Sequence, residues 1–279
     1  MKTAIYAGSF DPISNGHLWV INQGSKLFDK LFLVLAYNPN KNGYFTVNQR
    51  QALMKESTKH LANVEVVLLA DDYVAQAAKK MHATYLLRGI RNSTDYEYEK
   101  TIERVNNKIN PDLQTVYLIP PAELSEISSS MVKSLVGFPG WQLLVGTTVP
   151  SVVVSGFLYQ MHAQYLKTEW EKLVGTGTVS SKWLDIILTK HSESHRYYHN
   201  TSHLVALLKN MSDLPMQNSL TTAALKYSVF FHDIIYDPKS KNNELDSKNL
   251  FIEFTKEYPV DGLISSLVEE TILATAHHF

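Results

Sequence analysis

The sequence predicts an α/β domain with a five-stranded parallel sheet, followed by a second domain that is entirely helical. In the first half, short apolar runs alternate with segments of helical period, and five such βα units in succession are typical of a doubly wound sheet. In the second half, from about residue 165, the helical period continues without a convincing series of strands. The length of 279 residues fits two domains, and we place the boundary near Met161, giving domains 1–161 and 162–279.

The strands of the first domain are predicted from runs rich in Val, Ile, Leu and Tyr. Their nearly continuous apolar character predicts a parallel sheet covered on both faces, with strands at 3–7, 31–37, 64–69, 84–87 and 115–119. Helices are expected between them near 16–28, 48–60, 72–81, 95–108 and 129–136. Two pairs have the capping-box spacing that marks a helix start, Thr46 with Gln49 and Thr94 with Glu97.

The second domain is predicted to contain six helices. Apolar residues recur at helical spacing between 220 and 235, and we expect helices near 163–174, 180–190, 202–211, 218–236, 243–257 and 261–276. The segment from Lys172 to Ser181, which contains Gly175 and Gly177, predicts a loop.

Composition excludes several classes of protein. A net charge of −1 without a basic block argues against a general nucleic-acid-binding surface. The absence of cysteine excludes disulfides, thiolate nucleophiles and thiolate metal sites. No apolar run approaches the length of a membrane span, and the first one is too short for a signal peptide, so we expect a cytoplasmic protein that does not bind a membrane.

The turn after the first predicted strand has the features of a phosphate site. Ligands of parallel sheets lie beyond the carboxyl ends of the strands, where the run from Gly8 to His17 leads directly into a helix. Gly16 and His17 occupy the first turn of that helix, where free N–H groups favour an anion and an imidazole can donate to a phosphate oxygen. A surface loop with a capping histidine explains the Gly-His pair alone, but not the whole run.

Further polar residues follow the other predicted strands. Lys41 follows the second strand, where a lone lysine is typical of a solvated loop; Arg88 and Arg91 follow the fourth and suit forked phosphate contacts. Three serines, Ser128 to Ser130, stand at a helix start after the fifth strand, and an ordinary N-cap explains one of them. Neither GxGxxG nor GxxxxGK[ST] is present, so no dinucleotide fingerprint or P-loop is indicated.

The segments GSFDPISNGH, NPNK, LLRGIRNSTDYEYE and ISSSMVKS, in this order and at matching spacing, resemble the phosphopantetheine adenylyltransferase family over residues 1 to about 160. The resemblance implies a Rossmann-like nucleotidyltransferase domain that transfers AMP from ATP to 4′-phosphopantetheine, giving dephospho-CoA and pyrophosphate in coenzyme A biosynthesis. It also implies Mg²⁺ with ATP and a homohexamer.

Site residues follow from the same resemblance. It implies catalytic roles for His17, Lys41 and Arg91, and contacts of the pantetheine substrate with Ser9, Lys41, Val74 and Arg88. It implies an ATP site lined by Ser9, Phe10, His17, Gly89, Ile90, Arg91, Glu99, Leu124, Ser125, Glu126, Ile127, Ser128, Ser129 and Ser130. Departures from the family pattern, which bear on affinity more than on chemistry, are Ser9 and Ser14 for threonine, Val74 for methionine and Ser134 for glutamate.

The second half contains the segments RYYHNTSHL and FHDIIYD and the pair Asn243-Glu244. Lone histidines are usually core residues, but these patterns resemble the HD superfamily of metal-dependent phosphohydrolases. The resemblance implies a divalent metal ion held by His203, His232 and Asp233, with His199, Arg196 and Glu244 contacting the substrate or supporting the ligands. It also implies a closing aspartate after His277 and His278, so we expect this HD-type domain to be C-terminally incomplete.

Three functions remain open from the sequence. The first is a bifunctional adenylyltransferase and phosphohydrolase, and the second is an adenylyltransferase with a degenerate regulatory or partner-binding HD-type domain. The third is a nucleotidyltransferase for a nicotinamide or glycerol phosphate acceptor, against which the RGIR…DYEYE segment argues.

Overall fold

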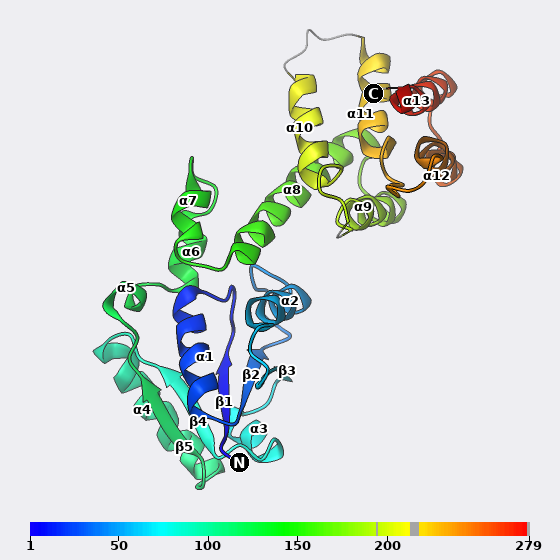
Figure 1. Cartoon of the computed structure of the whole chain (residues 1–279). Coiled ribbons are helices and arrows are strands. Elements are labelled where there is room, and N and C mark those ends of the chain that lie inside the picture. Colours follow the sequence, from blue (N-terminus) through cyan, green and yellow to red (C-terminus); the bar gives the residue numbers. More distant parts are fainter. Residues whose placement is uncertain (194, 213–217, 278–279) are drawn as a thin grey trace. The chain divides into compact units, whose positions relative to one another are not determined.

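The computed structural model describes residues 1–193, 195–212 and 218–277. The chain divides into two compact units, Met1–Phe157 and Leu158–Phe279, which are described separately (Figure 1). The division falls within helix α8 (Ser151–Val174), which is continuous. Nothing in the backbone marks the boundary expected near Met161, which stays a prediction.

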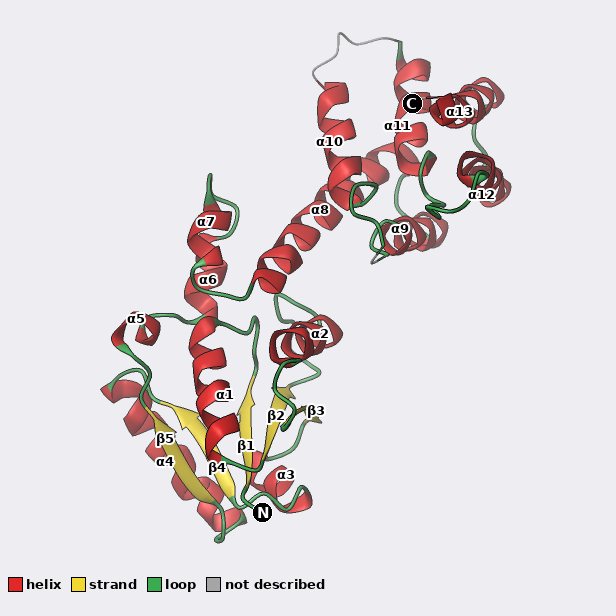
Figure 2. Ribbon diagram, viewed as in Figure 1, coloured by secondary structure: helices red, strands yellow, loops and turns green. Residues whose placement is uncertain are grey.

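The first unit is built on five parallel strands in the order β3-β2-β1-β4-β5 (Figure 2). The strands lie where the apolar runs predicted them, at β1 (Thr3–Gly8), β2 (Lys30–Tyr37), β3 (Val64–Ala70), β4 (Tyr85–Gly89) and β5 (Gln114–Leu118). Ala4 of the central strand β1 is opposite Leu31 of β2 on one side and Tyr85 of β4 on the other. The predicted parallel α/β sheet is confirmed.

Helices cover both faces of the sheet. On one face, Gly24 of α1 (Asn15–Leu27) packs against Leu31 and Leu87. On the other face, alanines of α3 (Val74–Lys80) form a core with Ile5 and Val34. The remaining helices of this unit are α2 (Val47–Thr58), α4 (Ser93–Ile109), α5 (Ala122–Ser125), α6 (Ser129–Leu135) and α7 (Trp141–Gly146). The short helices α5 and α7 were not predicted, because they are too short to show a helical period.

One of the two predicted helix caps is confirmed and the other is wrong. Thr46 and Gln49 form the expected reciprocal pair, with N···O distances of 3.0 and 3.3 Å. Helix α4 starts before Thr94, because the Asn92 side chain accepts the N–H of Asp95 at 2.9 Å and caps the helix. Asparagine is one of the strongest N-caps, so the earlier residue takes the role.

The second unit is helical throughout its described residues. Besides the C-terminal part of α8, it comprises α9 (Thr178–Lys190), α10 (Thr201–Ser212), α11 (Ser219–Phe231), α12 (Asn243–Glu257), α13 (Gly262–Ala274) and the 3₁₀ turn η1 (Thr275–His277). Its core is aromatic, and the rings of Trp170 and Trp183 both pack against those of Phe231 and Phe254. The predicted all-helical second region is confirmed.

Three boundaries in this region differ from the predictions. Helix α8 begins well before residue 163, since the apolar run near 149–159 is helical. Phe157, the last residue of the first unit, packs on Phe45 of the same unit. The loop expected from Lys172 to Ser181 is reduced to residues 175–177, where glycines at φ +79° and +153° make the turn. Helix α11 ends at Phe231 instead of near 236. None of the described helices is long and apolar enough to span a membrane.

Candidate functional site

A cavity of about 370 Å³ opens at the carboxyl ends of β1 and β4. Strands β2 and β3 lie on one side of β1, and β4 and β5 lie on the other, so the strand order reverses direction between β1 and β4. The cavity is at this topological switch point, where ligands of such sheets bind. Its walls come from residues 6–20, 88–99 and 120–130, and its lining is Tyr6, Ala7, Gly8, Phe10, Ser14, Gly16, His17, Val20, Arg88, Gly89, Arg91, Asp95, Tyr98, Glu99, Pro120, Leu124, Ile127, Ser128, Ser129 and Ser130.

His17 is held in one tautomer by the cap of helix α1. The N–H of Ser14, the N-cap residue, donates to Nδ1 of His17 at 3.1 Å, so Nδ1 is the acceptor and the ring proton is on Nε2. Burial, reinforced by the charge of Arg91, lowers the pKa of His17 to about 4. The imidazole is therefore neutral near pH 7, and Nε2–H is the donor that it can offer to a ligand in the cavity.

The ring of His17 packs against a strained residue. Phe10 has φ +41°, a left-handed conformation that is uncommon for a residue with a side chain and costs roughly 1–3 kcal/mol. Its buried ring meets Tyr6 and His17 edge to face, with centroid distances of 5.5 and 5.1 Å. The strain places an aromatic wall behind the imidazole.

Asp11 holds the turn between β1 and α1 in place. Its carboxylate accepts the N–H groups of Tyr44 and Phe45 at 2.8 and 2.9 Å and pairs with Lys133 at 3.2 Å. Burial alone would raise the pKa of Asp11, but these donors lower it below its usual value. Ser129 adds a bond from its hydroxyl to the carbonyl of Pro12 at 2.8 Å. The turn that carries His17 is thus tied to segments far away in the sequence.

Two ion pairs form the opposite wall. Arg88 pairs with Glu99 at 3.0 Å and donates to the carbonyl of Ala7 at 2.8 Å. Arg91 makes a forked pair with Asp95, at 2.7 and 3.1 Å. A phosphate in the cavity would meet two guanidinium groups, each of which already has a carboxylate partner.

The three serines of the ISSS segment have different positions. Ser128 caps α6 by accepting the N–H of Met131 at 3.1 Å, which is the ordinary cap that the sequence allowed for one of them. Ser129 fastens the β1–α1 turn through Pro12, and Ser130 lines the cavity.

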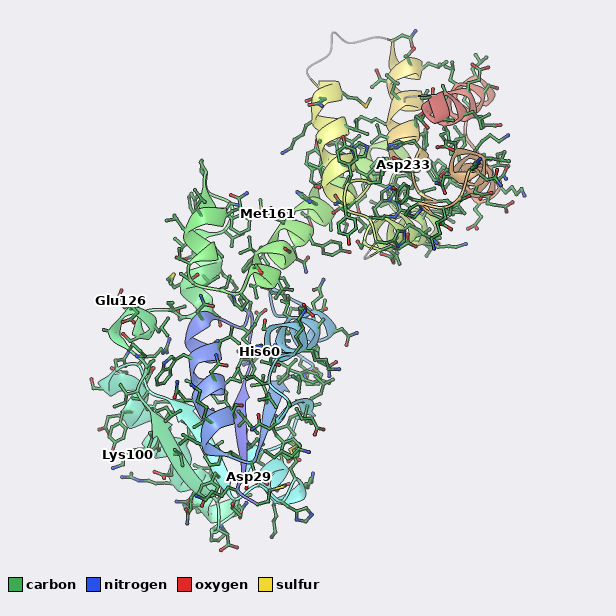
Figure 3. The ribbon with its side chains drawn as sticks, viewed as in Figure 1. Asp29, His60, Lys100, Glu126, Met161 and Asp233 are labelled. Carbon is green, nitrogen blue, oxygen red and sulfur yellow. The ribbon has the colours of Figure 1, made fainter. Side chains whose placement is uncertain are left out.

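The structure gathers eleven of the expected site residues around the cavity and leaves six outside its lining. Those that line it are Phe10, His17, Arg88, Gly89, Arg91, Glu99, Leu124, Ile127, Ser128, Ser129 and Ser130; those that do not are Ser9, Lys41, Val74, Ile90, Ser125 and Glu126. Glu126, labelled in Figure 3, follows helix α5. Ser9 instead offers its carbonyl to Arg50 at 3.0 Å.

Lys41 and Val74 lie near a second hollow of the same unit. It is formed after β2 and β3 by residues that include Tyr37, Asn38 and Tyr73. Lys41 follows in the turn closed by its N–H to the carbonyl of Asn38 at 3.0 Å, and Val74 begins α3.

Asp95 and Tyr98 line the cavity but were not predicted. The spacing of Arg91 and Asp95, four residues apart near a helix start, was the available signal for their pairing. The role of Ser14 was also missed, since the usual capping box has Glu or Gln where this chain has His17.

The helical unit contains four neighbouring side chains of the kinds that bind metals in proteins. We call these residues, His199, His203, His232 and Asp233, the histidine–aspartate cluster. Oδ2 of Asp233, a residue labelled in Figure 3, lies 2.7 Å from Nδ1 of His199 and 2.8 Å from Nε2 of His232. Nε2 of His232 lies 3.3 Å from Nε2 of His203. Ligand atoms of His199, His203 and Asp233 all lie within 4.8 Å of one another.

The histidines around Asp233 hold its carboxylate in the ionised form. Nδ1 of His232 lies 3.0 Å from the carbonyl oxygen of Val229, which can only accept, so Nδ1 carries a proton. Burial would raise the pKa of Asp233, but His232 and His199 lower it to about 2. Burial, followed by the charge of His232, lowers the pKa of His203 to about 4.

Arg196 is turned into the protein instead of toward a substrate. Its side chain is fully buried and donates to the carbonyls of Asp233, Ile234 and His199 at 2.6, 2.9 and 3.2 Å. Glu193 balances its charge at 3.0 Å. Arg196 therefore satisfies the carbonyls that follow the end of α11 and ties them to the segment before α10.

Helix α12 secures the rest of this irregular stretch. Ser247 accepts the N–H of Ile235 at 3.1 Å, and Asn243 bonds both the N–H and the carbonyl of Asp237 at 2.9 Å. These bonds explain why α11 stops at Phe231. Glu244, expected to support the site, lies in the first turn of α12 and is not one of the four cluster residues.

The closing aspartate expected after His277 and His278 is not testable here. The backbone of His277 ends the 3₁₀ turn, while His278 lies outside the described residues.

Comparisons with known proteins match the α/β unit. A family model described as cytidylyltransferase-like matches residues 5–135. The phosphopantetheine adenylyltransferase of Chromobacterium violaceum is 42% identical over 153 residues, covering 55% of this chain and 93% of that protein. The protein of that name from Neisseria meningitidis serogroup C is 40% identical over 157 residues, covering 56% and 92%.

A solved structure, the nicotinic acid mononucleotide adenylyltransferase of Plasmodium falciparum complexed with NaAD, is 17% identical with a TM-score of 0.42, covering 56% of this chain and 94% of that one. This likeness is too low to carry an argument, whereas the curated relatives are matched over nearly their whole length. Through its α/β unit, the chain belongs to the phosphopantetheine adenylyltransferase family and is a nucleotidyltransferase.

Proposed function

We propose that the α/β unit transfers AMP from ATP to 4′-phosphopantetheine, giving dephospho-CoA and pyrophosphate. The names of the relatives support this substrate pair. The observation that carries the chemistry is the neutral His17, whose Nε2–H is left for a ligand in a cavity at the switch point of the sheet. Such a donor suits a reaction in which charge grows on phosphate oxygens.

The reaction requires an in-line displacement. An oxygen of the substrate phosphate forms a bond to the α-phosphorus of MgATP while the bond from that phosphorus to the leaving pyrophosphate breaks, without a covalent enzyme intermediate. His17 donates a hydrogen bond to the transferring group, and Arg91 with Lys41 balances its charge. Because His17 is already neutral and oriented, little reorganisation is needed at the moment of transfer.

The two hollows of the unit suggest separate subsites. We assign ATP to the cavity beside β1 and β4, and the pantetheine arm to the hollow after β2 and β3, near Lys41 and Val74. Arg88, on the wall of the first cavity, would contact the acceptor phosphate. Ser9 and Ile90, which the family resemblance places in the ATP site, do not line the cavity. We propose that they contact the nucleotide only through neighbouring backbone.

Pyrophosphate release tests the assignment. The full chain with MgATP is supplied in turn with 4′-phosphopantetheine, pantetheine, nicotinamide mononucleotide and glycerol 3-phosphate. Release is expected with 4′-phosphopantetheine alone, since the unphosphorylated control lacks the attacking oxygen. Turnover with one of the last two acceptors and none with the first would overturn the proposal.

We further propose a homohexamer in the cytoplasm, the state that family resemblance implies. Exposed apolar side chains on the α/β unit, Ile119, Phe138, Leu143 and Leu144, are consistent with burial in an oligomer. Light scattering on the full chain would give the mass, and a monomer at micromolar concentration would contradict this state.

A second activity is proposed for the helical unit, as a metal-dependent phosphohydrolase of HD type. His203, His232 and Asp233 would hold a divalent ion, a hypothesis supported by the short distances from Nε2 of His232 to Oδ2 of Asp233, 2.8 Å, and to Nε2 of His203, 3.3 Å. When bound, such an ion supplies Lewis-acid polarisation of a phosphoester. The rival is a regulatory or partner-binding domain without catalysis.

Two measurements distinguish the hydrolase from the regulatory domain: analysis of the metal bound by the purified protein, and hydrolysis assays on a panel of phosphomonoesters and phosphodiesters. Bound metal together with hydrolysis that Asp233→Asn abolishes supports the hydrolase. A protein that binds metal but hydrolyses nothing, or that binds none, favours the regulatory function.

A further inference from the structure

We infer that Arg50 is a positioning residue for phosphate binding in the α/β unit. It holds the peptide group between Ser9 and Phe10 toward a phosphate, and it supplies a positive charge that the protein itself does not balance. The inference rests on the proposed transfer reaction for the identity of the ligands. None of the sequence segments that resemble the adenylyltransferase family includes Arg50.

The side chain of Arg50 is buried without an acidic partner. Only 5% of the residue is exposed, and its Nε has no hydrogen-bond partner among the described residues. Arg88, Arg91 and Arg196 each pair with a carboxylate, whereas no described carboxylate pairs with Arg50. Because an unbalanced buried charge costs free energy, this arrangement favours an anion that comes from outside the protein.

The position of Arg50 in its helix adds to the positive potential. Arg50 is the fourth residue of α2, and its N–H closes the first turn on the carbonyl of Thr46 at 2.9 Å. This end of a helix is the positive end of its dipole, which favours anions and disfavours cationic side chains. Asp11, which fastens the neighbouring turn, already pairs with Lys133 and accepts two backbone N–H groups. The charge of Arg50 therefore remains available to a ligand.

Arg50 and Arg88 hold successive carbonyls where the chain leaves β1. Nη1 of Arg88 donates to the carbonyl of Ala7 at 2.8 Å. Nη1 of Arg50 donates to the carbonyl of Ser9 at 3.0 Å. That carbonyl shares a peptide group with the N–H of Phe10, a cavity-lining residue whose N–H has no acceptor in the part of the chain that the structure describes. A charged donor on the carbonyl polarises the peptide group, so the N–H becomes a stronger donor to a phosphate oxygen.

A purely structural role is the rival explanation, in which Arg50 only fastens α2 to the β1–α1 turn. That role predicts that replacing Arg50 lowers stability and leaves ligand affinity unchanged. The positioning role predicts the opposite. An apolar side chain of similar volume in place of an unbalanced buried charge is neutral or stabilising, while the phosphate loses its partner.

Titration calorimetry on the full chain tests the inference and separates two sources of phosphate, MgATP without acceptor and 4′-phosphopantetheine without ATP. Arg50→Met is expected to bind at least one of them roughly tenfold more weakly or worse. Its kcat/KM for pyrophosphate release should fall by about 100-fold, and its unfolding midpoint in urea should be no lower than that of the wild type. Lys55→Met is the matched control, because it removes a positive charge from an exposed position of the same helix and should bind as the wild type does.

A second variant keeps the test decisive if Arg50→Met does not fold. Arg50→Gln retains a neutral N–H for the carbonyl of Ser9 and removes the charge, so it should fold and still bind at least one ligand more weakly. Wild-type affinity for both ligands in folded Arg50→Gln would overturn the inference.

Each outcome of the titrations bears on the inference. Weaker binding of MgATP alone assigns the nucleotide phosphate to Arg50, weaker binding of 4′-phosphopantetheine alone assigns the acceptor phosphate, and either result supports it. Unchanged affinity for both ligands, or an equal loss in Lys55→Met, contradicts it. If the wild type binds MgATP but releases no pyrophosphate with 4′-phosphopantetheine, the proposed acceptor fails, and the MgATP titration still decides the role of Arg50.

Discussion

The cavity of the α/β unit and the histidine–aspartate cluster of the helical unit are positioned by different means. The cavity residues follow the carboxyl ends of adjacent parallel strands, so the hydrogen-bonded order of the sheet brings them together. The cluster lies where α11 has ended, and the backbone there is held by side chains of Arg196, Asn243 and Ser247. In the α/β unit the sheet brings the site residues together and Asp11 only fastens one turn, whereas in the helical unit buried side chains hold the whole irregular stretch behind the cluster.

This difference predicts separate consequences for substitutions. Changes at the cavity should reduce catalysis while the fold persists. Changes behind the cluster should reduce stability and metal binding together.

The largest effect is expected for His17→Ala in the cavity. Removing one preorganised donor to a developing charge should lower kcat by roughly a hundredfold or more, about 3 kcal/mol. His17→Gln, which keeps a side-chain N–H, should lose less. Steady-state pyrophosphate release measures both, and near-normal turnover of His17→Ala would remove His17 from the mechanism.

Arg196→Met should destabilise the helical unit. The apolar side chain leaves the carbonyls of Asp233, Ile234 and His199 without their donor, at a cost of about 3 kcal/mol. Urea unfolding followed by circular dichroism measures the loss. Lys182→Met breaks only the solvent-exposed pair with Glu257 and serves as the control; equal effects of the two variants would contradict the role of Arg196.

Acid should destabilise the helical unit through His191. Burial lowers the pKa of His191 to about 3, partly offset by its bond to the carbonyl of Ile187, so the unfolded chain takes up this proton at higher pH than the folded one. The stability is complete above the ordinary pKa of about 6.5 and falls as pH decreases, by on the order of 2–3 kcal/mol at pH 4.5.

Thermal unfolding of wild type and His191→Leu between pH 7.5 and 4.5, in the presence of a chelator, measures the contribution of His191 to the pH dependence of stability. The variant should lose less stability over the interval than the wild type. His60→Gln, at an exposed position of the α/β unit, should behave as the wild type does. Parallel pH curves for His191→Leu and wild type would contradict the prediction.

The smallest effect concerns the cap of α4. Asn92→Ala removes the acceptor for the N–H of Asp95 and should cost about 1 kcal/mol. Thr94→Ala, at an exposed position inside the first turn, should change the free energy of unfolding by less than about 0.5 kcal/mol. A larger loss of stability in Thr94→Ala than in Asn92→Ala would instead support Thr94 as the cap, as the spacing of Thr94 and Glu97 predicted.

Much of the α/β unit was predictable because its signals are local. The five apolar runs located the strands, and the rule that ligands lie beyond strand ends led to His17, Arg88, Arg91 and Ser129. The same local reasoning could not show that Lys41 lies outside the cavity lining, because that depends on the orientation of the turn after β2. It also could not show that Asp95 lines the cavity, because that depends on the orientation of the start of α4.

By itself, the sequence determined the parallel α/β sheet, the helical second unit and the residue types available for phosphate and metal chemistry, since hydrophobic period and turn residues act over a few positions. Only the tertiary structure decided which imidazole nitrogen His17 offers, that Arg196 is buried behind the cluster, and that His199 joins Asp233. These outcomes depend on contacts between segments distant in sequence, whose side-chain orientations are set by packing.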